Sequence, residues 1–216
     1  AQAHIFEDDP RDLIEEMVAT GAVYTRKDFE FFETTADLSQ RVISHADLEF
    51  GLKTLEPNAG RGALAVPAAK IVGIENVTCI ELMERNVKHL QALGFGITQA
   101  QDFLAVPAQP VYDRILLNPP FSAGRDGAHI QHAYQFLAPG GRLVAIASTQ
   151  WQTHTTAPAK AFQAFLAKLD AKVEQIEAGA FKESGTDVPT TLIVLCKPVA
   201  KRVTTSVAEQ VDLFTF

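Results

Sequence analysis

Hydrophobic residues recur along the chain in two alternating patterns, short continuous runs and longer stretches with helical spacing. The short runs predict β-strands at residues 52–55, 77–82, 97–100, 113–117 and 142–148. The longer stretches predict helices at residues 63–69, 84–93, 127–137 and 162–169. Gly94 follows the second of these helices and Pro139-Gly140-Gly141 follows the third, so each has a stop signal. Strands that alternate with helices predict a mostly parallel sheet with helices on both faces.

The two ends of the chain depart from this alternation. Residues 173–178 and 190–196 are strand-like with no helix between them, which predicts a C-terminal antiparallel hairpin and a seven-stranded sheet. Near the N-terminus, residues 12–18 have helical spacing, and Thr35 begins a second capped helix. The predicted organisation is a helical extension over residues 1–33, an α/β domain over 34–200 and a tail over 201–216.

The composition is ordinary for a soluble globular protein of 216 residues, with 47% hydrophobic and 21% charged residues. No apolar run approaches the roughly 18 residues that span a bilayer, and the first residues do not resemble a signal peptide. We therefore expect a cytoplasmic protein with no membrane partner. The formal net charge is −7, whereas proteins that hold duplex DNA unaided have a basic face. Binding of nucleic acid would need a partner or a local basic patch, for which the candidates are Arg125, Lys182, Lys197, Lys201 and Arg202.

The segment Asn118-Pro119-Pro120-Phe121 directly follows the apolar run at 115–117. Proline fixes φ and has no N–H, so the strand ends here and leaves an amide and an aromatic ring at its tip. An amino group on a flat ring would find acceptors in the Asn118 side-chain oxygen and a backbone carbonyl, of Asn118 or Pro119. Phe121 is available to stack on that ring. The segment therefore suits methylation of an exocyclic nitrogen, although a proline turn with Phe121 in the core would show the same residues.

A second polar segment, residues 56–62, joins the first predicted strand to its helix. In a doubly wound sheet this turn approaches the ligand closely, and Gly60 and Gly62 permit the approach because they lack a Cβ. Glu81 ends the second predicted strand about 20 residues further on, where a carboxylate can accept hydrogen bonds from a ribose. A dinucleotide site is a weaker interpretation, since Ala65 stands at its third glycine position and residues 118–121 would have no role.

The chain resembles class I S-adenosylmethionine-dependent amino-methyltransferases, which have a Rossmann-like fold. The resemblance lies in the order of four motifs along the chain: the glycine turn, Glu81, Asp102 and residues 118–121. The resemblance extends over residues 34–197 and is to bacterial, phage and plasmid adenine-N6 DNA methyltransferases related to restriction-system modification subunits. Asn58 stands where the broader family often has glycine. The resemblance implies S-adenosylmethionine as cofactor, DNA as partner, and direct methyl transfer to a base flipped out of the duplex.

The same resemblance implies roles for individual residues. The expected cofactor-binding residues are Glu56, Asn58, Gly60, Gly62, Glu81, Asp102, Phe103 and Asn118, and the expected catalytic residues are Asn118, Pro119, Pro120 and Phe121. Glu81 would bind the ribose, Asp102 the adenine amino group and Phe103 the adenine ring. Asp102 would equally serve as the N-cap of a helix. Asn118 and Pro119 would accept hydrogen bonds from the target amine.

Three alternatives stay open on the sequence. An RNA base methyltransferase, acting on guanine N2 or adenine N6, uses the same four tip residues and fits the low positive charge. A glutamine-amide methyltransferase usually prefers Tyr at position 121. A partner-dependent or non-catalytic subunit fits the absence of an insert of about 100 residues that could form a target-recognition domain.

The remaining histidines, cysteines and the tryptophan give weaker indications of function. His129 and His132 lie three apart on a predicted helix with no third ligand in view, so no metal site is predicted. Cys79 and Cys196 lie in apolar, strand-like runs and are expected to be buried thiols. Trp151 would either line the base pocket or pack in the core.

Overall fold

The computed structural model describes residues 34–97, 100–176 and 189–199. The predicted helix at 12–18, the hairpin connection and the tail lie outside these residues. The described helices are α3 (Ala36–Ala46), α4 (Ala65–Val72), α5 (Glu84–Ala92), α6 (Arg125–Phe136), α7 (Gln150–Thr153) and α8 (Ala157–Lys168). The strands are β1 (Thr54–Glu56), β2 (Val77–Cys79), β3 (Tyr112–Leu117), β4 (Leu137–Ser148), β5 (Lys172–Ile176) and β6 (Thr190–Cys196). Three short 3₁₀ turns are also described, at Ile74–Asn76, Phe103–Ala105 and Ser122–Gly124.

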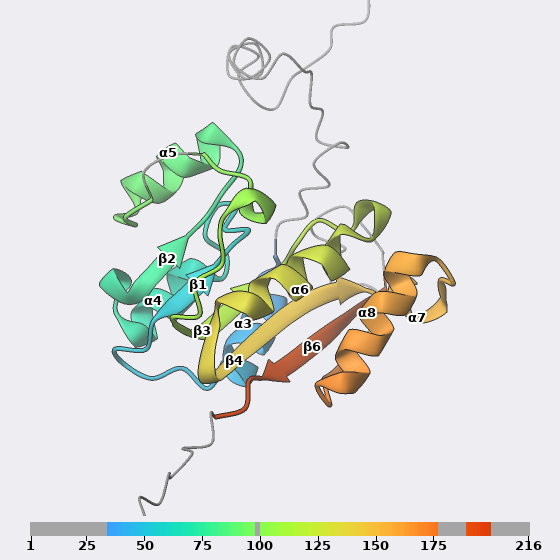
Figure 1. The fold of residues 1–216 in the computed structure, drawn as a ribbon. Helices are drawn as coiled ribbons and strands as arrows, with labels where there is room; N and C mark the ends of the chain where they lie inside the picture. Colours follow the sequence, from blue (N-terminus) through green and yellow to red (C-terminus); the bar gives the residue numbers. More distant parts are fainter. Residues whose placement is uncertain (1–33, 98–99, 177–188, 200–216) are drawn as a thin grey trace, which may run out of the picture.

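The described strands form one mixed sheet in the order β2-β1-β3-β4-β6-β5 (Figure 1). The strands β2, β1, β3 and β4 run parallel to one another. Strand β6 is antiparallel to both β4 and β5. The architecture is thus the predicted α/β, Rossmann-like one. Strands β5 and β6 are antiparallel neighbours, but the connection between them lies outside the described residues, so the hairpin stays a prediction.

Helices pack on both faces of the sheet because successive strand residues point to opposite sides. Leu55, Ile115 and Leu117 lie in one buried cluster with residues of α6 and α8. Leu116 and Val144 lie in a second cluster, with residues of α3 and α4. A smaller cluster joins α4 and α5 to β2. Figure 1 shows the sheet between these helical layers. The helices α4, α5 and α6 are the crossover connections between successive parallel strands.

The structure corrects several sequence predictions. Strand β2 ends at Cys79 instead of residue 82, because the Ile80 amide donates to the Glu56 carbonyl and the Ile80 carbonyl accepts from Ala59 (both 3.0 Å). The described residues contain six strands, with none at Ile97 or Ala100; Ile97 instead offers its carbonyl to a glutamine side chain. The short helix α7 had no predicted counterpart.

The Pro139-Gly140-Gly141 segment lies within β4 instead of separating a helix from a strand. The Gly140 amide donates to the Lys197 carbonyl and the Lys197 amide donates to the Gly141 carbonyl, both at 2.9 Å, so the segment is paired with the chain that follows β6. Cys79 is buried as predicted, but the prediction for Cys196 is wrong, since this last residue of β6 is exposed. No helix in the described ranges has the length and apolar character needed to cross a membrane.

Candidate active site

The glycine turn and the Asn-Pro-Pro-Phe tip lie at the same edge of the sheet. Strands β1 and β3 are parallel neighbours, with Leu55 in register with Ile115. Glu56 ends β1 and Asn118 follows β3, so both segments leave the sheet at its carboxyl edge. The order β2-β1-β3 makes the boundary between β1 and β3 the point where the strand order reverses. In doubly wound sheets, ligands bind in the crevice at this position.

The Glu81 carboxylate holds the glycine turn against β2. Its Oε2 accepts from the Gly60 amide at 2.7 Å, and its Oε1 accepts from the Met83 amide at 2.8 Å and from the Asn86 side chain at 3.3 Å. The side chain is buried, with 7% of the residue exposed. Gly60 has φ 52° and Gly62 φ 87°, both in the left-handed region. The Glu81 carboxylate thus anchors the turn, while its predicted role as the ribose ligand stays a prediction.

Gly62 is required by packing as well as by backbone conformation. A Cβ at this position would meet Val66 of α4 and Leu90 of α5, each at 3.2 Å. The missing side chain therefore lets the two helices approach each other beside the turn. Gly62 supports the position of the turn instead of facing a ligand directly.

Glu56 is a buried acid with unused hydrogen-bonding capacity. Only 2% of the residue is exposed, and its carboxyl group accepts from the amides of Leu64 and Ala65 at the start of α4. Burial, and secondarily the nearby Glu81 carboxylate, raise the pKa of Glu56 well above its usual value. Its Oε2 and the Oδ1 of Asn58 have no hydrogen-bond partner within the described part of the chain. Two buried acceptors beside a second carboxylate fit a ligand group that donates hydrogen bonds and carries positive charge.

The third predicted cofactor segment is adjacent to Glu81. The Gln101 amide donates to the Glu81 carbonyl at 2.7 Å, which brings the exposed Asp102 close to Glu81. Asp102 also caps the short 3₁₀ turn that follows it, accepting from the Leu104 amide at 3.0 Å. Phe103 is only 2% exposed and its ring packs against His132 and Phe136 in the core, so its contact with the adenine ring stays a prediction.

The target tip is more enclosed than the sequence indicates. Asn118 and Pro120 are half-buried and Pro119 is buried. Asn118 donates from Nδ2 to the Thr34 hydroxyl at 3.1 Å. Phe121 is 5% exposed and belongs to the buried cluster that also contains residues of α3. Its ring is therefore a core side chain in this structure, and stacking on a base would require it to turn outward.

The backbone after the tip is held in an unusual conformation. Ala123 has φ 52° and Gly124 φ 74°, so two consecutive left-handed residues turn the chain into α6. The turn is fixed by Asp126, whose Oδ2 accepts from the amide and hydroxyl of Ser148 at 2.9 and 2.8 Å. Burial raises the pKa of Asp126 above its usual value. Sequence reasoning gave no role to this carboxylate, which joins the start of α6 to the end of β4.

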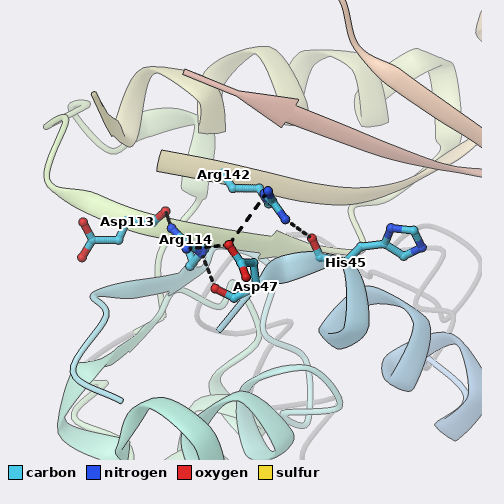
Figure 2. Close-up of polar contacts among 5 residues, drawn as sticks. All are labelled: His45, Asp47, Asp113, Arg114 and Arg142. Carbon is cyan, nitrogen blue, oxygen red and sulfur yellow. Dashed lines mark hydrogen bonds and ion pairs between the residues drawn. The ribbon is translucent and has the colours of Figure 1, made fainter. Parts of the chain in front are cut away.

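Helix α3 connects the tip to the opposite edge of the sheet. Its N-cap, Thr35, follows Thr34, which holds Asn118. At its other end, Figure 2 shows Arg114 and Arg142, from neighbouring strands, against the helix terminus. Arg114 donates to the Asp47 carbonyl at 2.9 Å, and Arg142 donates to the carbonyl of a residue in the last turn at 3.1 Å. Cations at a helix C-terminus stabilise the helix dipole, so α3 is anchored at both ends.

The basic patch expected from the sequence receives little support among the described residues. The Lys197 ammonium binds the Leu137 carbonyl at 2.7 Å, at the start of β4 and thus far from the tip that follows β3. Arg125 is exposed at the start of α6, close to the tip in sequence. The other candidates lie outside the described residues. In the ranges that the structure describes, no group of three or more His, Cys, Asp or Glu residues could hold a metal ion.

His129 lies in the core, with 6% of the residue exposed and a ring contact to Phe103. Its burial lowers the pKa to about 4 from the ordinary 6.5. The unfolded chain therefore binds a proton between these pH values that the folded protein does not bind, and stability falls as the pH decreases through this window. We expect wild type to lose about 2 kcal/mol relative to His129→Asn between pH 7 and 5.

Urea unfolding of both proteins across this pH range will measure the effect. The buried acids Glu56 and Asp126 are present in both proteins, so their opposite pH dependence cancels in the difference. Parallel curves for wild type and His129→Asn would contradict the assignment of the low pKa to His129.

Comparison with known proteins agrees with this geometry. The methyltransferase small domain model matches residues 33–194. No curated protein sequence matches the chain. A type I restriction-modification methyltransferase subunit from Streptococcus thermophilus is 20% identical with a TM-score of 0.60, over 75% of this chain and 43% of that one. A modification subunit of a putative type I restriction enzyme from Vibrio vulnificus is 16% identical with a TM-score of 0.62, over 88% of this chain and 48% of that one.

TrmN from Thermus thermophilus has the same fold, with 23% identity and a TM-score of 0.53, over 76% of this chain and 49% of that one. The chain thus spans less than half the length of each of these proteins. At such identities the similarity establishes the fold.

Proposed function

Because this chain belongs to the methyltransferase small domain family, whose cofactor is S-adenosylmethionine, we propose that it methylates the N6 amine of adenine in DNA. The observation that carries the proposal is the meeting of two segments at one sheet edge. The turn after β1 offers buried acceptors, and the Asn-Pro-Pro-Phe tip after β3 offers an amide. A cofactor and a flat amine placed at this edge would face each other.

The residues of the turn fit the charge of the cofactor. The Oε2 of Glu56 and the Oδ1 of Asn58 are buried acceptors with no donor among the described residues, which suits the ammonium group of the methionine part. Glu81 follows β2, and the hydrogen bond from the Gln101 amide to the Glu81 carbonyl brings Asp102 close to it, which suits the ribose and the adenine amino group. When bound, S-adenosylmethionine supplies a methyl group on an electrophilic sulfonium, so the protein needs to provide position and electrostatics.

The tip residues act on the target amine. The lone pair of an aromatic amine is delocalised into its ring, which makes the amine a poor nucleophile. Hydrogen bonds from the amine to the Asn118 side-chain oxygen and the Pro119 carbonyl would draw the nitrogen toward tetrahedral geometry. The same acceptors would stabilise the positive charge that develops on nitrogen. In duplex DNA the base must first be flipped out, and Phe121 would receive it after turning away from α3.

An RNA base is the second candidate substrate. The net charge of −7 is low for a protein that binds a duplex unaided, and RNA enzymes commonly act on unpaired bases. One of the proteins with this fold is TrmN. A guanine N2 or adenine N6 amine in RNA would meet the same acceptors at the tip.

Target recognition is proposed to require a partner chain or further protein segments. The chain spans less than half the length of the restriction-modification subunits it resembles. Of the five basic candidates from the sequence, only Arg125 and Lys197 lie in the described part of the chain, and only Arg125 is close to the tip in sequence. A modification subunit whose target sequence is recognised by another chain would need few basic residues of its own near the tip.

Transfer of a radiolabelled methyl group across a panel of DNA and RNA tests the proposal. The panel contains adenine-bearing duplex DNA, the same DNA with the adenines mismatched, single-stranded DNA and structured RNA, each incubated with the cofactor-loaded protein. Label in N6-methyladenine of DNA is the expected result, with mismatched sites favoured because they flip more easily. Label confined to RNA would select the second candidate. Label on neither, by a protein that binds the cofactor, would leave only the partner-dependent subunit.

A further inference from the structure

The Asn118 amide has two different ends, and the structure fixes which end points where. Its Nδ2 donates to the Thr34 hydroxyl at 3.1 Å. Because Nδ2 and Oδ1 share one planar carbon, a hydrogen bond at Nδ2 also sets the direction of Oδ1. A half-turn of the amide would exchange the two atoms. The proposed chemistry requires the oxygen, and an NH₂ group in its place would oppose the donors of the target amine.

Thr34 is well placed to hold the amide because it directly precedes an anchored helix. The next residue, Thr35, is the N-cap of α3 and accepts from the Leu38 amide at 3.5 Å. One turn further along, the Ser39 hydroxyl donates to the Ala63 carbonyl beside the glycine turn at 2.6 Å. The arginines of β3 and β4 hold the far end of the helix (Figure 2). Thr34 therefore connects the tip to a fixed element that also touches the cofactor turn.

We infer that Thr34 is a positioning residue, whose hydroxyl fixes the rotation of the Asn118 amide so that Oδ1 is directed at the target amine. This inference rests on the proposed function of the tip. It adds a residue that acts through Asn118 and to which the sequence patterns gave no role. Loss of the hydroxyl should impair the chemical step and leave cofactor binding and folding largely intact.

The test compares Thr34→Val, which removes the hydroxyl at nearly constant shape, with Thr34→Ser, which keeps it. We expect kcat of Thr34→Val to fall by about 10- to 100-fold, as for other small misplacements of a catalytic group. The Kd for S-adenosylmethionine should stay near the wild-type value, and Thr34→Ser should recover most of the rate. Thr35→Val is the matched control, since it removes the neighbouring capping hydroxyl; it should lower the melting temperature and reduce kcat far less than Thr34→Val does.

A second readout does not depend on activity. In ¹⁵N-labelled protein, the Asn118 side-chain NH₂ signals can be assigned by their disappearance in Asn118→Asp. Their exchange with solvent should be slow in wild type and Thr34→Ser and faster in Thr34→Val.

Each outcome separates the possibilities. An increase in the cofactor Kd of Thr34→Val with unchanged kcat would make Thr34 a cofactor ligand and overturn the inference. Unchanged kcat and unchanged amide exchange would overturn it as well. If wild type methylated no nucleic acid while the amide signals still depended on Thr34, the proposed function would fail and the inferred contact would stand.

Discussion

Replacing Asn118 by alanine will lower kcat for methyl transfer by about a thousandfold, the usual effect of removing a group that stabilises transition-state charge. The amide oxygen interacts more strongly with an amine that is becoming positive than with the neutral amine, so its loss affects the transition state selectively. The Kd for S-adenosylmethionine should change far less, because Glu56, Asn58 and Glu81 remain in place. Single-turnover kinetics with the DNA or RNA identified by the substrate panel, together with calorimetry of cofactor binding, will measure both quantities.

Two controls make this result specific. Asn118→Asp keeps an acceptor oxygen at the tip and should retain more activity than Asn118→Ala. The melting temperature of each variant shows whether the tip is still folded, since Asn118 also binds Thr34. If Asn118→Ala retained wild-type kcat, the tip would have no catalytic role and the target site would have to be sought elsewhere.

The affinity for S-adenosylmethionine should increase with pH, because binding removes a proton from Glu56. Burial raises the pKa of this carboxyl group in the ligand-free protein. A bound ammonium and sulfonium favour the charged carboxylate, so the complex binds fewer protons than the free protein. Below the raised pKa, linkage then predicts about a tenfold lower Kd for each pH unit gained. Calorimetry between about pH 5 and 7 avoids titration of the ligand's own amino group, whose pKa lies near 8.

Glu56→Gln removes the titrating group while keeping an oxygen that can accept from the amides of Leu64 and Ala65. The variant should bind the cofactor about 100-fold more weakly at the upper end of the range and show a flat pH profile, because it lacks the charged hydrogen bond. In wild type, the heat of binding should also depend on the ionisation enthalpy of the buffer. A variant with the wild-type slope would show that another group takes up the proton.

The same pKa shift gives a prediction of opposite sign for stability. The folded protein keeps a proton on Glu56 at pH values where the unfolded chain has lost it. Stability is therefore lost as the pH rises above the usual glutamate range. Glu56→Gln should accordingly raise the melting temperature of the ligand-free protein at neutral pH. A buried acid that weakens the free protein while strengthening ligand binding is typical of functional sites.

The sequence determined the elements and their order. Apolar runs between helical stretches placed β1, β3, α5 and α6 close to their observed bounds, because binary patterning reports directly on burial. Glycine, proline and acidic residues at strand ends located the turn at 56–62, Glu81 and the tip at 118–121, because these residue types have few uses at such positions. The class of cofactor followed from that order of motifs, and the family match at residues 33–194 agrees with it.

The tertiary structure decided everything that depends on contacts between distant segments. Only the pairing of β1 with β3 places the glycine turn and the Asn-Pro-Pro-Phe tip at one edge of the sheet. The roles of Thr34 and Asp126 depend on hydrogen bonds across the fold, and no local pattern announces them. Phe103 and Phe121 have the residue types of stacking platforms, yet both are buried, because an aromatic ring near a site gains more from packing in the core than from exposure to water.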